Sequence, residues 1–282
     1  SLLVILLLTC CAHCDDTFDF IVVGSGAGGG PLACNLASAG HRVLLLEAGE
    51  DEHDQEVPYS VPVMHPQASE DLNLAWSFFV RHYTNLTQQA KDPKFVRAKD
   101  GVLYPRGGTL GGSTAVNALI GVRPPNVDWD TIANITGDRT WSADSMGFFW
   151  NQLTKWLPLN LPNPLIATGD TKVLGIVVST VNAYVAAGHP GVSLDPFDIF
   201  RDISTVLQLL TADLNSDIAN DRGRGVYSFP QTFDTNWKRF GTRDNIRATV
   251  ARGVPLFVKT GALVTRVLFS NNTDGCKVVA SG

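Results

Sequence analysis

The stretch FDFIVVGSGAGGGPLACNLASAGHRVLLLEAG, residues 18–49, decides the fold of this 282-residue chain. A short apolar strand over residues 20–23 runs into the glycine turn of residues 24–29, and a helix of small residues follows. A second apolar strand over residues 43–46 ends at Glu47. This order of strand, glycine turn, helix, strand and acid predicts a dinucleotide-binding βαβ unit in an α/β protein.

Three glycines of this turn have a distinct physical role. Gly24 lets the chain leave the strand in a tight turn, Gly26 lets a pyrophosphate approach bare backbone, and Gly29 lets the helix pack close to the strand. The first N–H groups of the helix then attract the phosphates. Glu47 lies 21 residues after Gly26, where its carboxylate can accept hydrogen bonds from ribose hydroxyls.

The helix between the two strands carries further signals. Leu32 and Leu36 lie four residues apart and are expected to face the sheet. Gly40 is expected to end the helix as its C-terminal cap. A glycine-rich turn in another kind of α/β protein is the alternative interpretation, but it leaves the position of Glu47 unexplained.

Composition narrows the class of protein. Apolar residues make up 44% and charged residues 17% of the chain, which allows a sizeable core and argues against general disorder. The net charge of −5 and the lack of a basic run argue against nucleic acid as a partner. No spacing of cysteine and histidine residues suggests a metal site.

The first 14 residues, SLLVILLLTCCAHC, are similar to the apolar region and cleavage zone of a secretory signal peptide. Their apolar run at residues 2–8 is too short to span a bilayer, so stable membrane insertion is not expected. The chain starts at Ser1 without a charged leader, and we expect it to be truncated there. A buried strand is the alternative, disfavoured by the acidic pair Asp15-Asp16 that follows.

Cysteine usage and glycosylation sequons agree with secretion. Three of the five cysteines lie within the predicted signal peptide. Cys34 is most simply a packed thiol, and a Cys34–Cys276 bridge stays open as an alternative. Sequons for N-glycosylation occur at Asn85, Asn134 and Asn271. We therefore expect a secreted, extracellular glycoprotein.

A second glycine-rich stretch, YPRGGTLGGSTAVN, spans residues 104–117. One interpretation is a flexible linker between domains. The other is a loop whose bare backbone approaches a flat or anionic ligand. The apolar residues 118–122 follow it directly, whereas a linker should be polar on both sides. The ligand loop is therefore favoured.

The remaining chain gives weaker signals. A short apolar element is expected at residues 76–79, and helices near residues 142–153 and 200–214. From residue 254 onward, apolar runs and a turn at Asp274-Gly275 predict a β-meander.

The two glycine-rich stretches together resemble the glucose–methanol–choline (GMC) oxidoreductases, flavoenzymes that oxidise alcohols. Residues 18–49 are similar to the first motif of that family and residues 105–117 to its second. Trp76 and the tail from Arg243 onward resemble further segments, and the style of the first motif is closest to secreted fungal members. The resemblance implies FAD as the cofactor rather than NAD.

The resemblance also implies a domain plan. The α/β fold would be a Rossmann-like FAD-binding domain with an inserted, incomplete substrate-binding domain. After the signal peptide (1–14), residues 15–150 would form the first segment of the FAD-binding domain. Residues 151–224 would form part of the insert, and residues 225–282 the return to the FAD-binding domain.

Carried over onto this sequence, the motifs imply contacts with each part of FAD. Gly24, Gly26 and Gly29 would hold the pyrophosphate. Glu47 would bind the adenosine ribose, and Val264 would lie against adenine. The full implied cofactor-binding set is Gly24, Gly26, Ala27, Gly28, Gly29, Glu47, Ala48, Arg106, Leu110, Gly111, Gly112, Ser113, Asn117 and Val264.

The implied activity is oxidation of a small-molecule alcohol at its CH–OH group, with hydride passing to FAD and electrons to oxygen or a quinone-like acceptor. No catalytic residue is assigned, because the catalytic His of the family lies in a C-terminal half that this chain lacks. The 282 residues alone are therefore expected to be inactive. Gly108, Ala118 and Pro124 depart from the usual residues of the family, which weakens any statement about subclass.

Three other functions stay open. Some members of the family keep FAD but cleave hydroxynitriles, and nothing in these residues excludes that lyase activity. A non-catalytic fragment is the second alternative. The third is an NAD-dependent Rossmann enzyme, which would not need the second glycine-rich loop.

Overall fold

The computed structural model describes residues 17–51, 57–163, 169–186, 211–216, 227–270 and 279–280. The predicted signal peptide, the sequon at Asn271, the turn at Asp274-Gly275 and a Cys34–Cys276 bridge all involve residues outside this part of the chain. Most of the helix expected at residues 200–214 also lies outside it, and residues 211–214 are not helical, so that end of the prediction is wrong.

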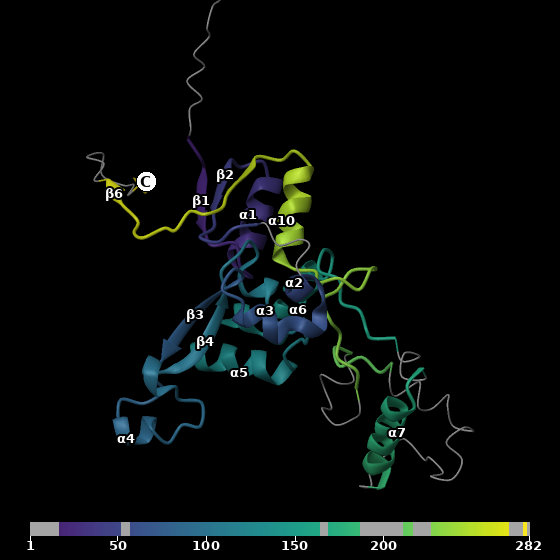
Figure 1. Ribbon diagram of the computed structural model, residues 1–282. Helices are drawn as coiled ribbons and strands as arrows, with labels where there is room; N and C mark the ends of the chain where they lie inside the picture. The colour runs from purple at the N-terminus through teal and green to yellow at the C-terminus, as the bar shows by residue number, and fades with distance from the viewer. Residues whose placement is uncertain are drawn as a thin grey trace, which may run out of the picture.

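A three-stranded parallel sheet carries the glycine fingerprint. Its strands and covering helices are β1 (Phe20–Val23), α1 (Gly29–Ser38), β2 (Val43–Leu46), α10 (Thr242–Ala251) and β5 (Leu256–Lys259). The order is β1-β2-β5, and Val43 pairs with both Phe20 and Leu256. In parallel strands this register brings all three carboxyl ends to one edge of the sheet. The helices α1 and α10 pack side by side against the sheet (Figure 1).

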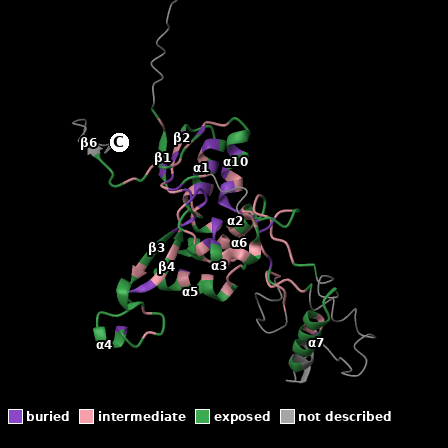
Figure 2. Cartoon of the chain, viewed as in Figure 1, coloured by how far each residue is buried: buried purple, intermediate pink, exposed green. Residues whose placement is uncertain are grey.

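The main core lies between this sheet and its two helices. Val43 and Leu45 of β2 are fully buried, and they belong to one cluster with Ala33 of α1, Ile246 of α10 and Leu256 of β5. Figure 2 shows the buried residues gathered over α1, α10 and the neighbouring strands. Burial of apolar side chains is the main force that holds helix to sheet, so this unit is the stable frame of the site.

The expectation that Leu32 faces the sheet is wrong. Its side chain is 52% exposed, and only Leu36 packs partly against the core. Small residues are buried instead, because α1 packs closely against both the sheet and the neighbouring helix α10. A Cβ atom on Gly30 would lie 2.3 Å from Cγ2 of Thr242. The expected cap is confirmed, since Gly40 follows the helix with a φ of +95°.

The second part of the fold begins with short helices and an antiparallel arm. The arm consists of β3 (Ala75–Val80) and β4 (Val102–Gly107), with α4 (Leu86–Gln89) near its tip (Figure 1). The helices of this part are α2 (Val57–Ser60), α3 (His65–Glu70), α5 (Asn126–Thr136) and α6 (Ala143–Leu153). Four 3₁₀ turns accompany them: η1 (Pro62–Met64), η2 (Arg97–Lys99), η3 (Gly112–Ala115) and η4 (Arg139–Trp141). The element expected at residues 76–79 is β3, and the helix expected at residues 142–153 is α6.

The predicted β-meander after residue 254 is wrong in its first half. β5 pairs in parallel with β2, and the following residues do not form a strand. Their backbone instead bonds to the end of β2, because the N–H groups of Gly261 and Ala262 donate to the carbonyls of Gly49 (3.1 Å) and Glu47 (2.8 Å). Only β6 (Phe269–Ser270) and β7 (Val279–Ala280) pair antiparallel, as a hairpin would.

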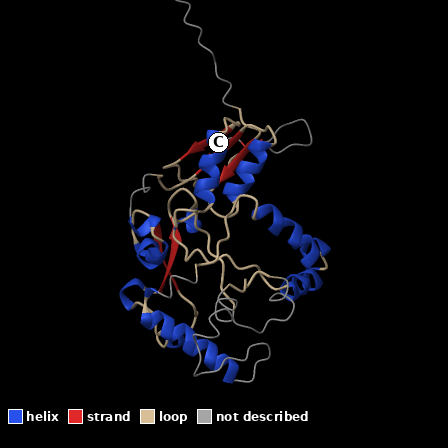
Figure 3. Cartoon of the chain, turned by 90° about the vertical axis from the view of Figure 1, so that its right-hand side faces the viewer, coloured by secondary structure: helices blue, strands red, loops and turns tan. Residues whose placement is uncertain are grey.

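The remaining described element is α7 (Thr171–Ala186), a 16-residue helix. Figure 1 shows it apart from the sheet and its helices, and Figure 3 shows the strands of the sheet gathered at one end of the molecule. No helix in the described stretches has the length and apolar character needed to cross a membrane. The boundaries predicted for the domains stay a prediction.

Candidate cofactor site

The first glycine loop leaves the start of α1 open to a ligand. Gly24 adopts a φ of +88°, and a Cβ on Gly29 would lie only 2.0 Å from the carbonyl oxygen of Gly24. The helix start carries neither a side-chain cap nor an acidic residue. Within the described residues, the backbone N–H groups of Ala27, Gly28 and Gly29 donate to no other group. These unused donors and the positive end of the helix dipole suit a phosphate group.

The second glycine loop lies directly against the first. A Cβ on Gly112 would approach the Cα of Gly26 to 2.9 Å, so this meeting of two backbones requires glycine. Gly111 and Gly112 have φ values of +97° and +54°, which favour glycine as well. The N–H of Gly111 donates to Oγ of Ser25 across 2.8 Å. The two motifs that were far apart in the sequence therefore form one surface of bare backbone.

Glu47 is held at this junction. It is 6% exposed, and its Oε2 accepts hydrogen bonds from the backbone N–H (2.9 Å) and the hydroxyl of Ser25. Its Oε1 accepts the N–H of Gly49 across 3.0 Å. A carboxylate has about four lone-pair sites, so one remains for a ribose hydroxyl. In this arrangement Glu47 also fixes Ser25, which in turn holds the second loop.

Backbone contacts anchor the second loop to the end of β2. Oγ1 of Thr109 donates to the carbonyl of Glu50 (2.6 Å), and the N–H of Leu110 donates to the same oxygen (3.0 Å). A Cβ on Gly49 would lie 1.9 Å from the carbonyl oxygen of Gly108, which leaves no space for any side chain. The backbone of this loop therefore lies in direct contact with the backbone of the residues that follow β2.

A cavity of about 190 Å³ opens where the loops meet α6 and α10. Its apolar wall comes from the end of α6, and its polar wall from the second loop and the start of α10. The lining residues are Ala27, Pro31, Thr114, Asn117, Leu153, Trp156, Leu157, Thr232, Phe240, Gly241 and Thr242. The hydroxyls of Thr114 and Thr242 lie 2.7 Å apart and join the loop to α10.

Arg239 supports the second loop from inside the protein. It is 3% exposed, and its Nη1 donates to the carbonyl oxygen (2.8 Å) and to Oδ1 (3.0 Å) of Asn117. Its Nε donates to the carbonyl of Tyr59 across 2.9 Å. Burial lowers the pKa of the Arg239 guanidinium to about 10, and raises the pKa of the neighbouring Tyr59 phenol.

A second charged group fixes α10. Asp51 accepts hydrogen bonds from Arg243 and, across 2.9 Å, from Nε of Arg247. Asp51 and Arg247 also line a cavity of about 390 Å³ between α10 and the end of β5. Burial raises the pKa of the Asp244 carboxyl at the start of this helix. These contacts tie the helix that lines the candidate site to the residues just after β2.

The other residues of the predicted set lie in different environments. Leu110 is 2% exposed and belongs to the main core, so its side chain supports the loop from below. The side chain of Arg106 turns back along β4, where Nη1 donates to the carbonyl of Pro105 (2.7 Å). Ser113 accepts the N–H of Gly107 (3.2 Å). Val264 follows the segment that bonds to the end of β2.

Neither Ala48 nor His82 lines the cavity where the two loops meet. Ala48 is half-buried between Glu47 and Gly49. His82, one of the described histidines, lies on the β3–β4 arm, where Nδ1 contacts Asp92 (2.6 Å) and Nε2 contacts Tyr104 (2.8 Å). The part of the chain that the structure describes contains no cluster of His, Cys, Asp and Glu that could hold a metal ion.

Sequence reasoning missed three residues that organise the site. Ser25 is a variable position of the fingerprint, so the pattern assigned it no role. Arg239 and Tyr59 lie 180 positions apart, and neither belongs to a motif. The available signal was that Arg243 and Arg247 follow Arg239 at intervals of four residues, a spacing that also suits an exposed helix face.

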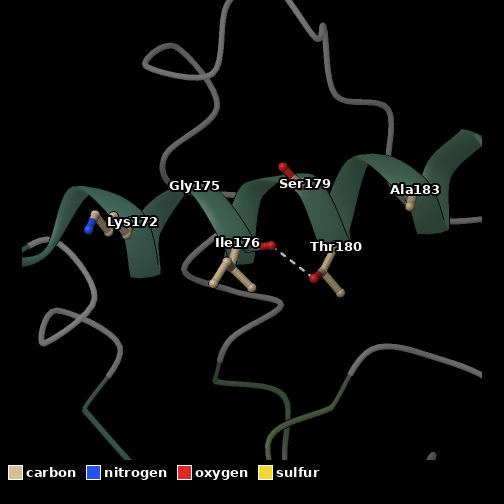
Figure 4. Close-up of a pocket in the computed structure, with 6 residues that line it drawn as sticks. All are labelled: Lys172, Gly175, Ile176, Ser179, Thr180 and Ala183. Carbon is tan, nitrogen blue, oxygen red and sulfur yellow. Dashed lines mark hydrogen bonds between the residues drawn. The ribbon is translucent and has the colours of Figure 1, made fainter.

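The hollow in Figure 4 lies elsewhere, on one exposed face of α7. Its lining residues all come from that helix: Lys172, Gly175, Ile176, Ser179, Thr180 and Ala183. The hydroxyl of Thr180 donates to the carbonyl of Ile176 (2.8 Å) within the same helix. None of the predicted cofactor residues contributes to this hollow.

A family model described as GMC oxidoreductase matches residues 18–281. The chain belongs to the GMC oxidoreductase family. The α/β fold with an FAD-binding domain and FAD as the cofactor, both expected from the sequence, are confirmed. The site fits this cofactor, because it offers unused backbone donors, bare glycine backbone and a carboxylate beside one another.

Three relatives illustrate the similarity. The chain is 27% identical over 262 residues to "GMC oxidoreductase family protein Mala s 12" of Malassezia sympodialis, covering 91% of this chain and 39% of the relative. It is 28% identical to "(R)-mandelonitrile lyase 3" of Prunus serotina, covering 94% and 36%. An FAD-dependent oxidoreductase from Chaetomium thermophilum has a TM-score of 0.60 at 19% identity, covering 94% and 44%. The chain thus spans less than half the length of these proteins.

Proposed function

We propose that this chain forms the FAD-binding part of a secreted oxidoreductase that acts on the CH–OH group of a small-molecule alcohol. The observation that carries the proposal is the contact between Gly26 and Gly112, which unites the two glycine loops into one bare surface. The free N–H groups of the first loop and the carboxylate of Glu47 border it. When bound, FAD supplies a hydride acceptor.

In this proposal each group of the site has a task. The N–H groups of Ala27, Gly28 and Gly29 bind the pyrophosphate, since they have no acceptor among the described residues. Glu47 accepts a ribose hydroxyl, and Val264 lies beside adenine. Gly24, Gly26 and Ala48 shape the backbone around the pyrophosphate and ribose, while Leu110, Gly111, Gly112, Ser113 and Asn117 form the wall toward the flavin. Arg106 supports that wall from β4.

Secretion and the domain plan belong to the same proposal. Asn85 and Asn134 are both exposed, which supports their use as glycosylation sites. The return of the chain to the FAD-binding domain after residue 225 is supported by α10 and β5, which complete the sheet unit that β1 and β2 begin. The electron acceptor is oxygen or a quinone-like compound.

A second candidate is an FAD-containing hydroxynitrile lyase. The similarity to the mandelonitrile lyase of Prunus serotina covers 94% of this chain, which supports this alternative. The two functions differ in what happens to the flavin. An alcohol oxidoreductase reduces it, so the visible flavin absorbance is lost, whereas a lyase releases cyanide without that loss.

The test uses the full-length protein, purified with its flavin and mixed anaerobically with a panel of primary and secondary alcohols. Bleaching by one of them supports the oxidoreductase, and admission of oxygen or a quinone then identifies the acceptor. Cyanide release from mandelonitrile without bleaching supports the lyase. A colourless protein that does not take up added FAD refutes both, and the isolated 282-residue chain is expected to be inactive.

A matched pair of variants tests the location of the site. Gly112→Ala places a Cβ 2.9 Å from the backbone of Gly26 and should abolish flavin retention. Gly175→Ala, in α7, meets nothing within 4 Å and should leave retention unchanged. Equal flavin content in the two variants would place the cofactor elsewhere.

A further inference from the structure

Asn117 lines the cavity at the junction of the loops, and its side-chain oxygen is already engaged. Oδ1 of Asn117 lies 3.0 Å from Nη1 of Arg239 and 3.1 Å from the backbone nitrogen of Leu119. A guanidinium and a backbone N–H can only donate. The atom that faces both must therefore be the oxygen, and the orientation of the amide follows from chemistry rather than from a choice between two similar atoms.

The other end of the amide is free. Nδ2 of Asn117 donates to no group within the described residues, and the residue as a whole is exposed. With its oxygen turned toward Arg239, the amide presents two N–H donors away from it. Carbonyl and phosphate oxygens, which FAD carries, are the acceptors that such donors bind.

The backbone around Asn117 cannot easily rearrange. Leu119 is 1% exposed and has a φ of +63°, a conformation that is strained for a residue with a side chain. Its carbonyl accepts the N–H of Thr232 across 2.8 Å. Such strain persists only where surrounding contacts over-determine it, and here the N–H of Leu119 also donates to the Asn117 oxygen that Arg239 holds.

Arg239 is unusual for a buried cation. It has no carboxylate within ion-pair distance among the described residues, and its Nη2 has no hydrogen-bond partner there. Burial of this cation costs free energy, which its hydrogen bonds and the more distant attraction of Asp244 offset only in part. Its bonds go mainly to backbone carbonyls and to Asn117, so it acts on the loop rather than on a counter-ion.

We propose that Arg239 is a positioning residue that fixes the amide of Asn117 as a hydrogen-bond donor to an oxygen atom of FAD. The proposal rests on the proposed function, since it needs FAD in this site. Arg239 itself does not border the cavity and acts through Asn117. Its effect therefore depends on the presence of the Asn117 side chain.

The test measures the affinity of the full-length apoprotein for FAD by fluorescence titration, which does not require turnover. Arg239→Met keeps the bulk but removes the donors, and should raise the dissociation constant about tenfold, the value of one well-placed hydrogen bond. Asn117→Ala should have a similar effect. The double variant should be no more than about twofold weaker than either single variant, because both remove the same interaction.

Two further variants separate positioning from general support of the fold. Arg239→Lys retains a donor that reaches one oxygen and should recover most of the affinity. Asn117→Asp keeps an oxygen for Arg239 but replaces the N–H donors by an acceptor, so it should weaken FAD binding by more than about tenfold without unfolding the protein. Arg81→Met, at an exposed ion pair with Asp100 on the arm, is the control and should leave the affinity unchanged.

The outcomes distinguish failure of the proposed function from failure of the role proposed for Arg239. Failure of the unaltered protein to bind FAD refutes the proposed function. If it binds FAD, then normal affinity in Asn117→Asp or in Arg239→Met overturns the role of Arg239, and so does a double variant whose loss equals the product of the two single losses. Should Arg239→Met not fold, the comparison between Asn117→Asp and Arg239→Lys still decides.

Discussion

Removal of the Ser25 hydroxyl should weaken the contact between the two glycine loops. Ser25 is fully buried, and its Oγ donates to Glu47 while accepting the N–H of Gly111 (2.8 Å). Ser25→Ala therefore deletes a hydrogen bond to a charged group and leaves a buried N–H without an acceptor. These two losses together should lower the free energy of unfolding by about 3 kcal/mol. Glu47 keeps its bonds to the N–H groups of Ser25 and Gly49, so the effect concerns the second loop.

Equilibrium urea unfolding of the full-length protein, followed by tryptophan fluorescence, measures this change. Ser69→Ala is the matched control, because that hydroxyl donates to the carbonyl of Pro66 (2.8 Å) at the surface. The control should stay within about 0.5 kcal/mol of the unaltered protein. A Ser25→Ala variant as stable as the control would show that the hydroxyl does not hold the loops together, and the reasoning would fail.

Three other outcomes follow from the same geometry. Gly49→Ala forces a Cβ to 1.9 Å from the carbonyl of Gly108 and should cost about 3 kcal/mol or more in urea unfolding, against little change for Gly147→Ala. Burial raises the pKa of the Cys34 thiol, so iodoacetamide at about pH 8 should leave Cys34 unmodified until the protein unfolds, as peptide mass spectrometry can test. Burial also raises the pKa of the Tyr59 phenol above 10.0, so the folded state holds that proton more tightly than the unfolded chain. The stability that this retained proton contributes is fully present below about pH 10 and is lost as the pH rises through the folded pKa. Tyr59→Phe should therefore flatten the decline of stability above about pH 10 in unfolding measurements. Equal slopes for the variant and the unaltered protein would contradict the prediction.

Local chemistry explains which parts of the fold could be predicted. The glycine fingerprint, the cap at Gly40 and the strand ending at Glu47 each depend on residues close in sequence, and all three are present. The burial of α1 was mispredicted because it depends on α10, which follows about 200 residues later. With a second helix packed so closely, small residues suit the interface better than Leu32.

The candidate site shows the same limit. Both glycine loops could be found from their composition, because backbone that must approach other atoms closely excludes side chains. Their mutual contact through Ser25 and Gly111 could not, since those residues lie 86 positions apart. The role of Arg239 was harder still to predict, because a single arginine carries no periodicity that distinguishes a buried hydrogen-bond donor from a solvated surface charge.

The place of β5 in the sheet has a consequence for synthesis of the chain. The N–H of Glu47 donates to the carbonyl of Lys259 (2.9 Å). The edge of β2 that pairs with β5 therefore gains its neighbour only about 200 residues after β2 is synthesised. At ribosomal rates of about 5–20 residues per second, that edge waits on the order of 10–40 s for its neighbour. During this interval β2 offers an unpaired strand edge, which is the state most open to wrong pairing with other chains. Chaperones or slow codons acting in this window would therefore influence the yield of folded protein without altering its final stability.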